Sequence, residues 1–448
     1  MTLRLSPADA VWFYGENSAN PMMISAILWF DRRLDVDRLR ERFEERILAR
    51  HPVFTQCIVP PLNPFAMPRW EDDPEFDLDR HVEVSELPDP GEQEQLESIV
   101  SEQRSTPLAR DHPLWKVHVF NNYRGVASAM HVRIHHSVGD GLALMALMLS
   151  LADEFEPGAV PLAEDHHLGF GDILHRAEQA VVEASRMALR PVELTRTVRR
   201  TADAARWAGK LLTPIIADRT VLIGRPQGDK RAVWDPAGLP LDGVKRAGKR
   251  YGATINDVLL SLMTGALHRY LSDYESVVDD AVMVVPVNLR IPGEPLPRHL
   301  GNRIGLLPIE LPVGIRDAEE RLRVIQDRIG AVKDSPAPWV SRLVLASTAL
   351  LSPAVERGVH RLNQIRGTGV VTNVPGPQFP LHVGGALIEG VVGWGGMTAH
   401  LNLSAAFVSL NGRIFSGFVT DEAITPDPER ILEYLQREWA EWRVAVAA

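Results

Sequence analysis

The chain has 448 residues, a length that exceeds one ordinary hydrophobic core and favours two domains. Hydrophobic residues make up 45% and charged residues 24%, as is typical of a soluble globular protein. The net charge of −10 argues against binding of bulk nucleic acid. Cys57 is the only cysteine, which excludes an intramolecular disulfide and fits a reducing cytosol. We interpret Cys57 as a packing residue in an apolar, proline-rich loop rather than as a nucleophile.

The start of the chain gives no indication of export. It runs directly into Pro, Asp and Glu, without the apolar segment of a signal peptide. No uninterrupted apolar run approaches the ~18 residues that would suggest a membrane span. We therefore expect a cytoplasmic protein with at most peripheral membrane contact.

The first half is predicted to alternate strands with helices. Residues 23–30 form an apolar strand, and residues 36–50 form an amphipathic helix with its apolar side chains on one face. Strands at 115–120 and 126–135 are expected to pair as a hairpin. An apolar helix at 142–155 follows, so a strand end, a short loop and a helix start come in succession.

Residues 157–227 break this alternation. They open with a loop rich in Pro and Gly and continue into helices bounded by Pro191 and Pro214. The part at 186–210 is basic with interleaved apolar residues, a pattern that fits a helix lying on an anionic membrane surface. The alternative is a linker helix that packs its apolar face on the domains.

The second half resumes the alternation. Thr254 and Asp257 have the spacing of a capping box before a long periodic helix. A helix at 317–333 and a C-terminal helix are also predicted. Strands are expected at 282–287, 306–311, 369–372, 391–394, 403–408 and 414–419.

One heptapeptide carries most of the chemical information. Residues 135–141 read His-His-Ser-Val-Gly-Asp-Gly and join a predicted strand to a predicted helix. Gly139 and Gly141 are expected to permit a sharp turn. A second pair, His166-His167, has no Asp-Gly after it and is interpreted as loop residues.

The two histidines of the heptapeptide should point to opposite faces of the strand. His136 has the parity of the apolar residues and His135 that of the polar ones. The pair is therefore poorly placed to chelate a metal, and because no other cluster has zinc spacing we expect no metal site. A neutral histidine beside an apolar cavity can take a proton from an alcohol, which makes His136 the candidate general base. The alternative is a buried pair satisfied by backbone hydrogen bonds.

Asp140 is expected to support the loop rather than to react, because an aspartate between glycines is typical of turns. It would hold the loop through hydrogen bonds or through an ion pair with an arginine. Arg290 is the candidate partner.

The heptapeptide matches the His-His-x-x-x-Asp-Gly signature of CoA-dependent acyltransferases. Four further stretches resemble the bacterial wax ester synthase/diacylglycerol acyltransferase family, in the family's order and over nearly the whole chain. They are residues 5–9 with Glu16 and Pro21-Met22; Pro113-Leu114-Trp115; residues 253–258 with Asn256-Asp257; and residues 372–377 with Asn373 and Pro375-Gly376.

This resemblance implies an α/β (α+β) fold. Two chloramphenicol-acetyltransferase-like domains would form a pseudo-dimer with a tunnel between them. The domains would span residues 1–160 and 228–448, joined by a helical linker at 161–227. Only the first half carries the heptapeptide.

The resemblance also implies an O-acyltransferase. It would move a long-chain acyl group from acyl-CoA to diacylglycerol, giving triacylglycerol, or to a long-chain alcohol, giving wax ester. Acyl-CoA would be a co-substrate, and no cofactor is expected. The acceptor would be collected at the surface of the inner membrane or of a lipid droplet.

In this interpretation His136 removes the hydroxyl proton as the acceptor oxygen attacks the thioester. Asn256 is the candidate donor to the oxyanion, with the alternative that Asn256 and Asp257 only cap a helix. Pro375-Gly376 is expected to be a tight turn that shapes the tunnel.

The chain departs from the family pattern at two places. Met23 stands where a histidine commonly follows Pro-Met, and residues 142–145 replace a turn of small residues. Both changes would alter the substrate channel. Two other interpretations remain: an acyltransferase that uses a carrier-protein-bound acyl group, and a catalytically silent lipid-binding scaffold. A plant alcohol acyltransferase is disfavoured, because residues 392–396 only faintly resemble the Asp-Phe-Gly-Trp-Gly element.

Overall fold

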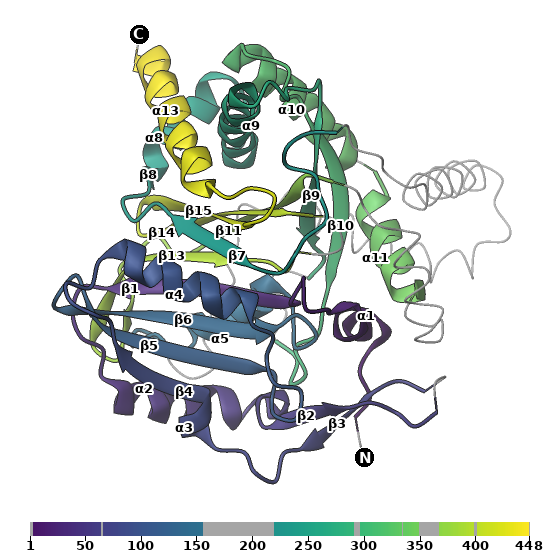
Figure 1. Ribbon diagram of the computed structural model, residues 1–448, viewed down its shortest axis with the longest axis vertical. Coiled ribbons are helices and arrows are strands. Elements are labelled where there is room, and N and C mark those ends of the chain that lie inside the picture. Colours follow the sequence, from purple (N-terminus) through teal and green to yellow (C-terminus); the bar gives the residue numbers. More distant parts are fainter. Residues whose placement is uncertain are drawn as a thin grey trace, which may run out of the picture.

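A computed structural model describes residues 3–63, 66–155, 219–290, 296–333, 335–348, 367–397 and 401–447. In this part of the chain two large β-sheets, each with its own helices, form two halves that are stacked in Figure 1. The predicted α/β fold is confirmed. The segment at 186–210 and the pair His166-His167 lie outside the described residues.

The first sheet has the strand order β12-β13-β1-β6-β5-β4. Its strands are β1 (Met23–Phe30), β4 (Val82–Glu86), β5 (Trp115–Tyr123), β6 (Ala127–His135), β12 (His382–Val383) and β13 (Ala386–Trp394). The predicted hairpin of β5 and β6 is present. β13 comes from the second half of the chain and pairs with β1. The domain boundaries at 160 and 228 stay a prediction, but the sheet itself is shared by both halves of the sequence.

The second sheet has the order β10-β9-β11-β14-β15-β7, and β8 also pairs with β15. Its strands are β7 (Lys230–Trp234), β8 (Leu239–Pro240), β9 (Ala281–Asn288), β10 (Ile304–Leu311), β11 (Gly369–Pro375), β14 (Leu403–Leu410) and β15 (Arg413–Asp421). A separate hairpin joins β2 (Gln56–Val59) and β3 (Arg69–Asp72). Cys57 lies on β2, so its predicted place in a loop is wrong.

Helices cover both sheets. Those of the first half are α1 (Pro7–Gly15), α2 (Val36–Arg42), η1 (Phe43–Leu48), η2 (Pro52–Phe54), α3 (Leu78–His81), α4 (Gln93–Ser105) and α5 (Gly141–Leu149). Those of the second half are α8 (Leu241–Arg250), α9 (Ile255–Asp273), α10 (Ala318–Lys333), α11 (Ala337–Thr348) and α13 (Pro428–Ala447). Figure 1 shows α8, α9, α10 and α13 gathered above the second sheet. No helix within the described ranges has both the length and the hydropathy to cross a bilayer.

Two predicted helices end earlier than expected. α5 stops at Leu149 instead of residue 155, and Arg46 of η1 then donates to the carbonyls of Ser150 and Ala152. The helix predicted at 36–50 changes from α to π geometry at Phe43. At the end of α5 this long-range contact overrides the local periodicity.

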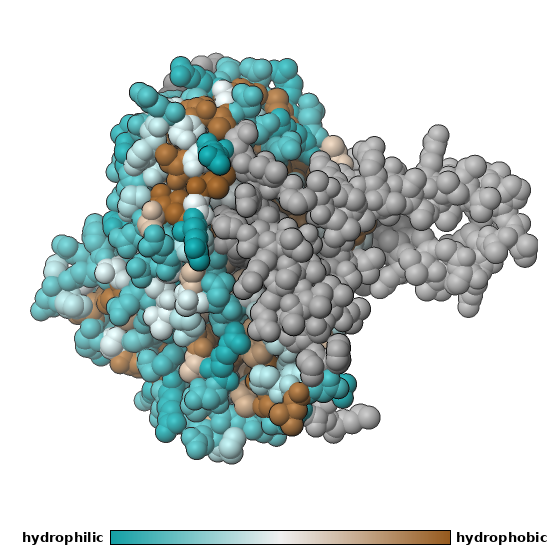
Figure 2. All heavy atoms as spheres, turned by 45° about the vertical axis from the view of Figure 1, so that its right-hand side comes forward, coloured by the Kyte–Doolittle hydropathy of each residue, from teal (hydrophilic) through white to brown (hydrophobic). Residues whose placement is uncertain are grey.

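A cluster of buried aromatic rings joins the two sheets. Trp29 of β1 meets Phe415 of β15 edge to face at 5.2 Å, and the Trp234 and Trp394 rings lie 6.0 Å apart. Gly417 allows this close approach, because a Cβ there would come within 2.8 Å of Trp394. On the face shown in Figure 2, hydrophilic residues predominate outside the grey region, and hydrophobic patches border the grey atoms.

Candidate active site

The heptapeptide joins β6 to α5 and is buried between the halves. On one face of β6, His131 and Arg133 form hydrogen bonds with Gln103 of α4. The other face carries His136 and the apolar residues Met130, Val132 and Ile134, which line a cavity. The predicted alternation is confirmed, and the two histidines of the pair have separate surroundings.

His136 is held tightly at the cavity wall. The Trp12 ring stacks on its imidazole, with centroids 3.8 Å apart and planes 8° from parallel. The ring atom Nδ1 lies 3.0 Å from the side-chain oxygen of Asn302, and the backbone N–H donates to the Met22 carbonyl. Nε2 has no hydrogen-bond partner among the described residues.

Burial lowers the pKa of His136 to about 4, although a hydrogen bond to the backbone of His136 itself, the Asp140 charge and the Asn302 hydrogen bond act to raise it. The imidazole is therefore neutral near pH 7 and can accept a proton at a free nitrogen.

His135 has a supporting position. Its Nδ1 accepts a hydrogen bond from the Ser137 backbone N–H at 3.0 Å, and its Nε2 lies 3.5 Å from a carboxylate oxygen of Glu16. Glu16 also accepts from Arg110. Burial alone would raise the pKa of the Glu16 carboxyl, but His135 and Arg110 together lower it to about 2. His135 thus anchors the loop to the segment that follows α1.

Asp140 and Arg290 form a buried ion pair, as the sequence suggested. Arg290 donates through Nε and Nη2, with the shortest distance 2.8 Å, and the Asp140 side chain is fully buried. The same carboxylate accepts from the backbone N–H groups of Ala143 and Arg303, so it caps α5 and holds the second half at once. Arg290 also donates to the Gly301 carbonyl.

The two glycines of the heptapeptide do not act as predicted. Neither Gly139 nor Gly141 has a positive φ, so the turn itself does not require glycine. Gly139 instead allows close packing, because a Cβ there would lie 3.2 Å from the Leu300 Cβ. Gly141 lines the cavity, and nothing lies within 4 Å of the position of its missing Cβ. A side chain at 141 would project into the cavity.

Pro113, Leu114 and Trp115 lie at the start of β5, where Trp115 pairs with Ile134 of β6. All three are buried, and none is part of the cavity wall. The Trp115 indole donates to the Phe54 carbonyl, and the Leu114 carbonyl accepts from the His135 backbone N–H. This element therefore positions the strand that carries the histidines.

The cavity has a volume of about 1040 Å³ and lies between the two halves. Side chains of β1, β6 and α5 line it on one side, and residues of α8, α9, β9 and β11 on the other. The predicted site residues in its wall are His136, Gly141, Asn256, Arg290, Asn373, Pro375 and Gly376. Pro375 is the last residue of β11, so the tight turn predicted at Pro375-Gly376 is wrong.

Asp257 closes a capping box with Thr254 and is not in the cavity wall. The capping interpretation is therefore confirmed for Asp257. Asn256, one position earlier, lies in the wall and keeps its candidate role.

Several residues of the site were not assigned from the sequence. Trp12 and Asn302 contact His136 directly, and Asp9 holds Asn302. Asp9 and Glu16 fall within the opening stretch that carries the family resemblance, so the sequence could have indicated that they belong to the site. Asn302 lies 166 positions from His136 and had none.

Comparison with known proteins agrees with this arrangement. A family model described as the wax ester synthase/diacylglycerol acyltransferase catalytic domain matches residues 5–259, and the family's C-terminal domain matches residues 300–442. A Mycobacterium tuberculosis protein named as a candidate diacylglycerol O-acyltransferase is 28% identical over 462 aligned residues, covering 99% of this chain and 96% of that protein.

Two solved structures show the same fold. The wax ester synthase/diacylglycerol acyltransferase from Marinobacter aquaeolei VT8 has a TM-score of 0.70 at 22% identity, covering 99% of this chain and 100% of that one. The first condensation domain of the calcium-dependent antibiotic synthetase has a TM-score of 0.61 at 17% identity, covering 100% and 97%. The protein is thus an acyltransferase. It belongs to the wax ester synthase/diacylglycerol acyltransferase family.

The low pKa of His136 predicts the pH dependence of turnover. With the neutral imidazole as the proton acceptor, activity is expected to stay level from about pH 7.5 down to about pH 5.5. Trp12→Ala admits water to the ring and should move its pKa back toward the ordinary value of 6.5, so that activity falls over the same interval. The measurement is kcat/KM against pH, with Trp70→Ala as a control that removes a buried Trp elsewhere. A wild-type profile falling near pH 6.5 would contradict the assignment.

Asp140→Asn should destabilise the protein by about 3–5 kcal/mol, because it leaves Arg290 buried without its counter-charge. The measurement is denaturant unfolding together with activity per folded molecule. Asp421→Asn is the matched control, since Asp421 forms a buried ion pair with Lys230 away from the cavity wall. Both variants should lose stability, but only Asp140→Asn should lose activity. Unchanged stability in Asp140→Asn would point to a direct chemical role instead.

Proposed function

We propose that this protein transfers a long-chain acyl group from acyl-CoA to diacylglycerol, to a long-chain alcohol, or to both. The observation that carries the proposal is the neutral His136, with Nε2 free of partners among the described residues, in the wall of an apolar cavity of about 1040 Å³. The family's name and that of the Mycobacterium tuberculosis relative support the acceptor class.

The lining of the cavity suits long apolar chains next to His136. α5 contributes the apolar side chains Leu142, Leu144, Met145, Met148 and Leu149 to its wall. Burying a methylene group contributes roughly 0.8 kcal/mol, so such a wall favours fatty chains over short ones.

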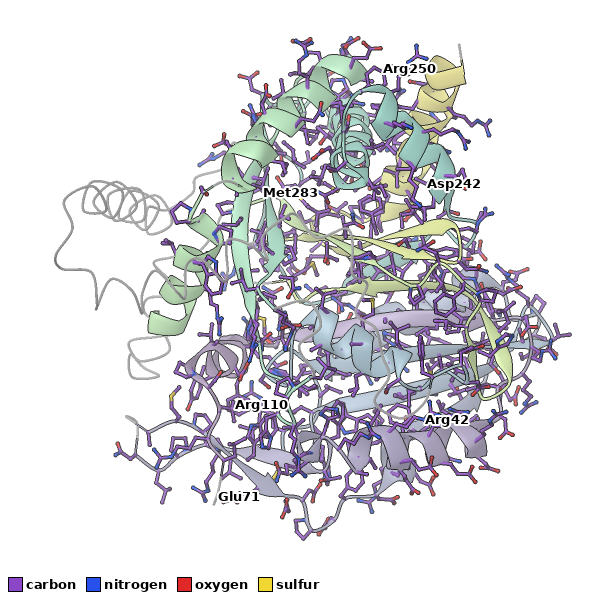
Figure 3. All side chains as sticks on the ribbon, turned by 180° about the vertical axis from the view of Figure 1, so that it is seen from behind. Arg42, Glu71, Arg110, Asp242, Arg250 and Met283 are labelled. Atoms are coloured by element: carbon purple, nitrogen blue, oxygen red, sulfur yellow. The ribbon has the colours of Figure 1, made fainter. Side chains whose placement is uncertain are left out.

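The donor's charged end has a candidate binding place on α8. Lys245 and Lys249, one helical turn apart, are exposed and also line the cavity. Figure 3 labels Asp242 and Arg250, which lie near the two ends of this helix. Phosphate groups such as those of CoA are stabilised by lysine ammonium groups of this kind. The phosphate of a carrier-bound acyl group has the same chemistry, so the test below supplies both donors.

In the proposed reaction His136 Nε2 takes the hydroxyl proton of the acceptor. The acceptor oxygen bonds to the thioester carbonyl carbon, and the carbonyl oxygen becomes an oxyanion. The C–S bond then breaks, the ester is released, and the leaving thiolate takes the proton back from the imidazolium. The free thiol has a pKa near 8.5, so it leaves readily.

The test is acyl transfer by the purified protein from palmitoyl-CoA to a panel that includes diacylglycerol and hexadecanol. We expect triacylglycerol or wax ester together with released CoA, resolved by chromatography. A parallel arm supplies the palmitoyl group on a carrier protein. Product from the carrier arm alone would replace acyl-CoA as donor, and no product in either arm would leave a lipid-binding role.

His136→Ala should lower kcat by about 10²- to 10⁴-fold with the fold intact, because the proton acceptor is lost. His135→Ala is the paired variant: it should retain more activity, since His135 faces Glu16 rather than the cavity. Circular dichroism and thermal unfolding establish the fold of both. Near-normal turnover in folded His136→Ala would exclude this histidine as the base.

Asn256→Ala should lower kcat by about 10²- to 10³-fold if its amide donates to the oxyanion. Asp257→Ala is the control on the same helix start. It removes a cap and should cost about 1 kcal/mol of stability with little change in kcat. An Asn256→Ala variant that loses only stability would reduce Asn256 to a helix-start residue.

A further inference from the structure

Asn302 contacts His136 from the opposite half of the molecule. It lies just before β10, and its amide meets both the ring and the backbone of His136. Asp9 of α1 accepts from the Asn302 backbone N–H and from its side-chain Nδ2, both at 2.8 Å. All three side chains are more than nine-tenths buried. The three residues form a chain of hydrogen bonds from Asp9 through Asn302 to His136.

The contacts of Nδ2 fix the orientation of the Asn302 amide. Nδ2 donates to Asp9 Oδ1 and also to the His136 carbonyl oxygen at 2.7 Å. Both partners are oxygen acceptors, so an amide turned by 180° would place its own oxygen against them. The amide oxygen must therefore face His136 Nδ1, at 3.0 Å.

This orientation selects one tautomer of the imidazole. Because the Asn302 oxygen can only accept, His136 Nδ1 must carry the hydrogen and donate it. The lone pair of the neutral ring is then on Nε2. Resting on the proposed function, we infer that Asn302, oriented by Asp9, is a positioning residue that keeps Nε2 of His136 as the proton acceptor.

The chain does not depend on the charge of Asp9. Burial raises the pKa of this carboxyl, although hydrogen bonds from Ser6 and Asn302 oppose the rise. In a protonated carboxyl the hydrogen would sit on Oδ2, which meets the Ser6 hydroxyl at 2.6 Å. Oδ1 accepts from Asn302 in either state, so the amide keeps its orientation.

The plane of the ring is fixed separately. Trp12 stacks on one face of the imidazole, and the Asn302 bond acts at its edge. Trp12 and Asp9 both lie on α1, one turn apart. This helix therefore fixes the plane of the His136 ring through Trp12. Through Asp9 and Asn302 it also fixes which ring nitrogen carries the hydrogen. Asn302 itself is not part of the cavity wall, and its loss should leave substrate binding largely unchanged.

The first measurement is the ¹⁵N spectrum of histidine-labelled wild-type protein near pH 7, with the His136 signals assigned by their loss in His136→Gln. We expect one neutral tautomer with the hydrogen on Nδ1. A hydrogen on Nε2 would overturn the inference without any further variant. This readout does not require activity, so it stands apart from the proposed function, which fails if the wild type transfers no acyl group.

The second measurement compares Asn302→Leu, which removes the acceptor and both donor contacts, with Asn302→Asp, which keeps an acceptor facing Nδ1. In Asn302→Leu only the backbone of His136 itself remains as an acceptor for the ring. The variant should therefore admit the Nε2–H tautomer beside the Nδ1–H form and lower kcat by about 10- to 100-fold with KM nearly constant. Asn302→Asp should keep the Nδ1–H tautomer and recover part of kcat.

Asn402→Ala is the matched control. Asn402 is a buried asparagine that donates to the Leu222 and Gly224 carbonyls and is not in the cavity wall. It should lose stability without a change in the His136 spectrum. A folded Asn302→Leu protein with the wild-type tautomer and kcat would overturn the positioning role.

Discussion

The buried ion pair between Asp140 and Arg290 holds the heptapeptide at residues 135–141 between the two halves. Charges removed from water destabilise a protein unless every lone pair and proton is matched. Asp140 meets that condition with the guanidinium, the start of α5 and the backbone N–H of Arg303. Arg290 in turn donates to the Gly301 carbonyl, next to Asn302. The Asp140 carboxylate therefore holds the loop that carries His136 next to the turn that carries Asn302.

This coupling explains how a single heptapeptide can serve two halves built around similar sheets. The first half supplies His136 and the apolar helix α5. The second supplies Arg290 and Asn302 beside the histidine and much of the cavity wall. The exchange of β13 into the first sheet and the aromatic contacts around Trp29 make the halves one packed unit.

Local patterns were sufficient to predict most strands and the position of His136. Alternation along β6 placed the two histidines on opposite faces, and the spacing of Thr254 and Asp257 gave the start of α9. What local patterns could not give was pairing over long distances. β13 joins β1 across more than 350 positions, and Asn302 reaches His136 across 166. The early end of α5 also involves a distant partner, because Arg46 of η1 donates to the Ser150 and Ala152 carbonyls beyond it.

The burial of His136 beside an apolar cavity also weakens the proposed base. With its pKa lowered to about 4, His136 stays neutral but has a modest affinity for a proton. Proton transfer then depends on stabilising the imidazolium as it forms. The backbone of His136 itself, the Asp140 charge and the Asn302 oxygen favour the cation, while Trp12 covers one face of the ring. The apolar cavity and the fixed tautomer thus act together on proton transfer. Because the His136 ring is already oriented, little reorganisation is needed when it accepts the proton.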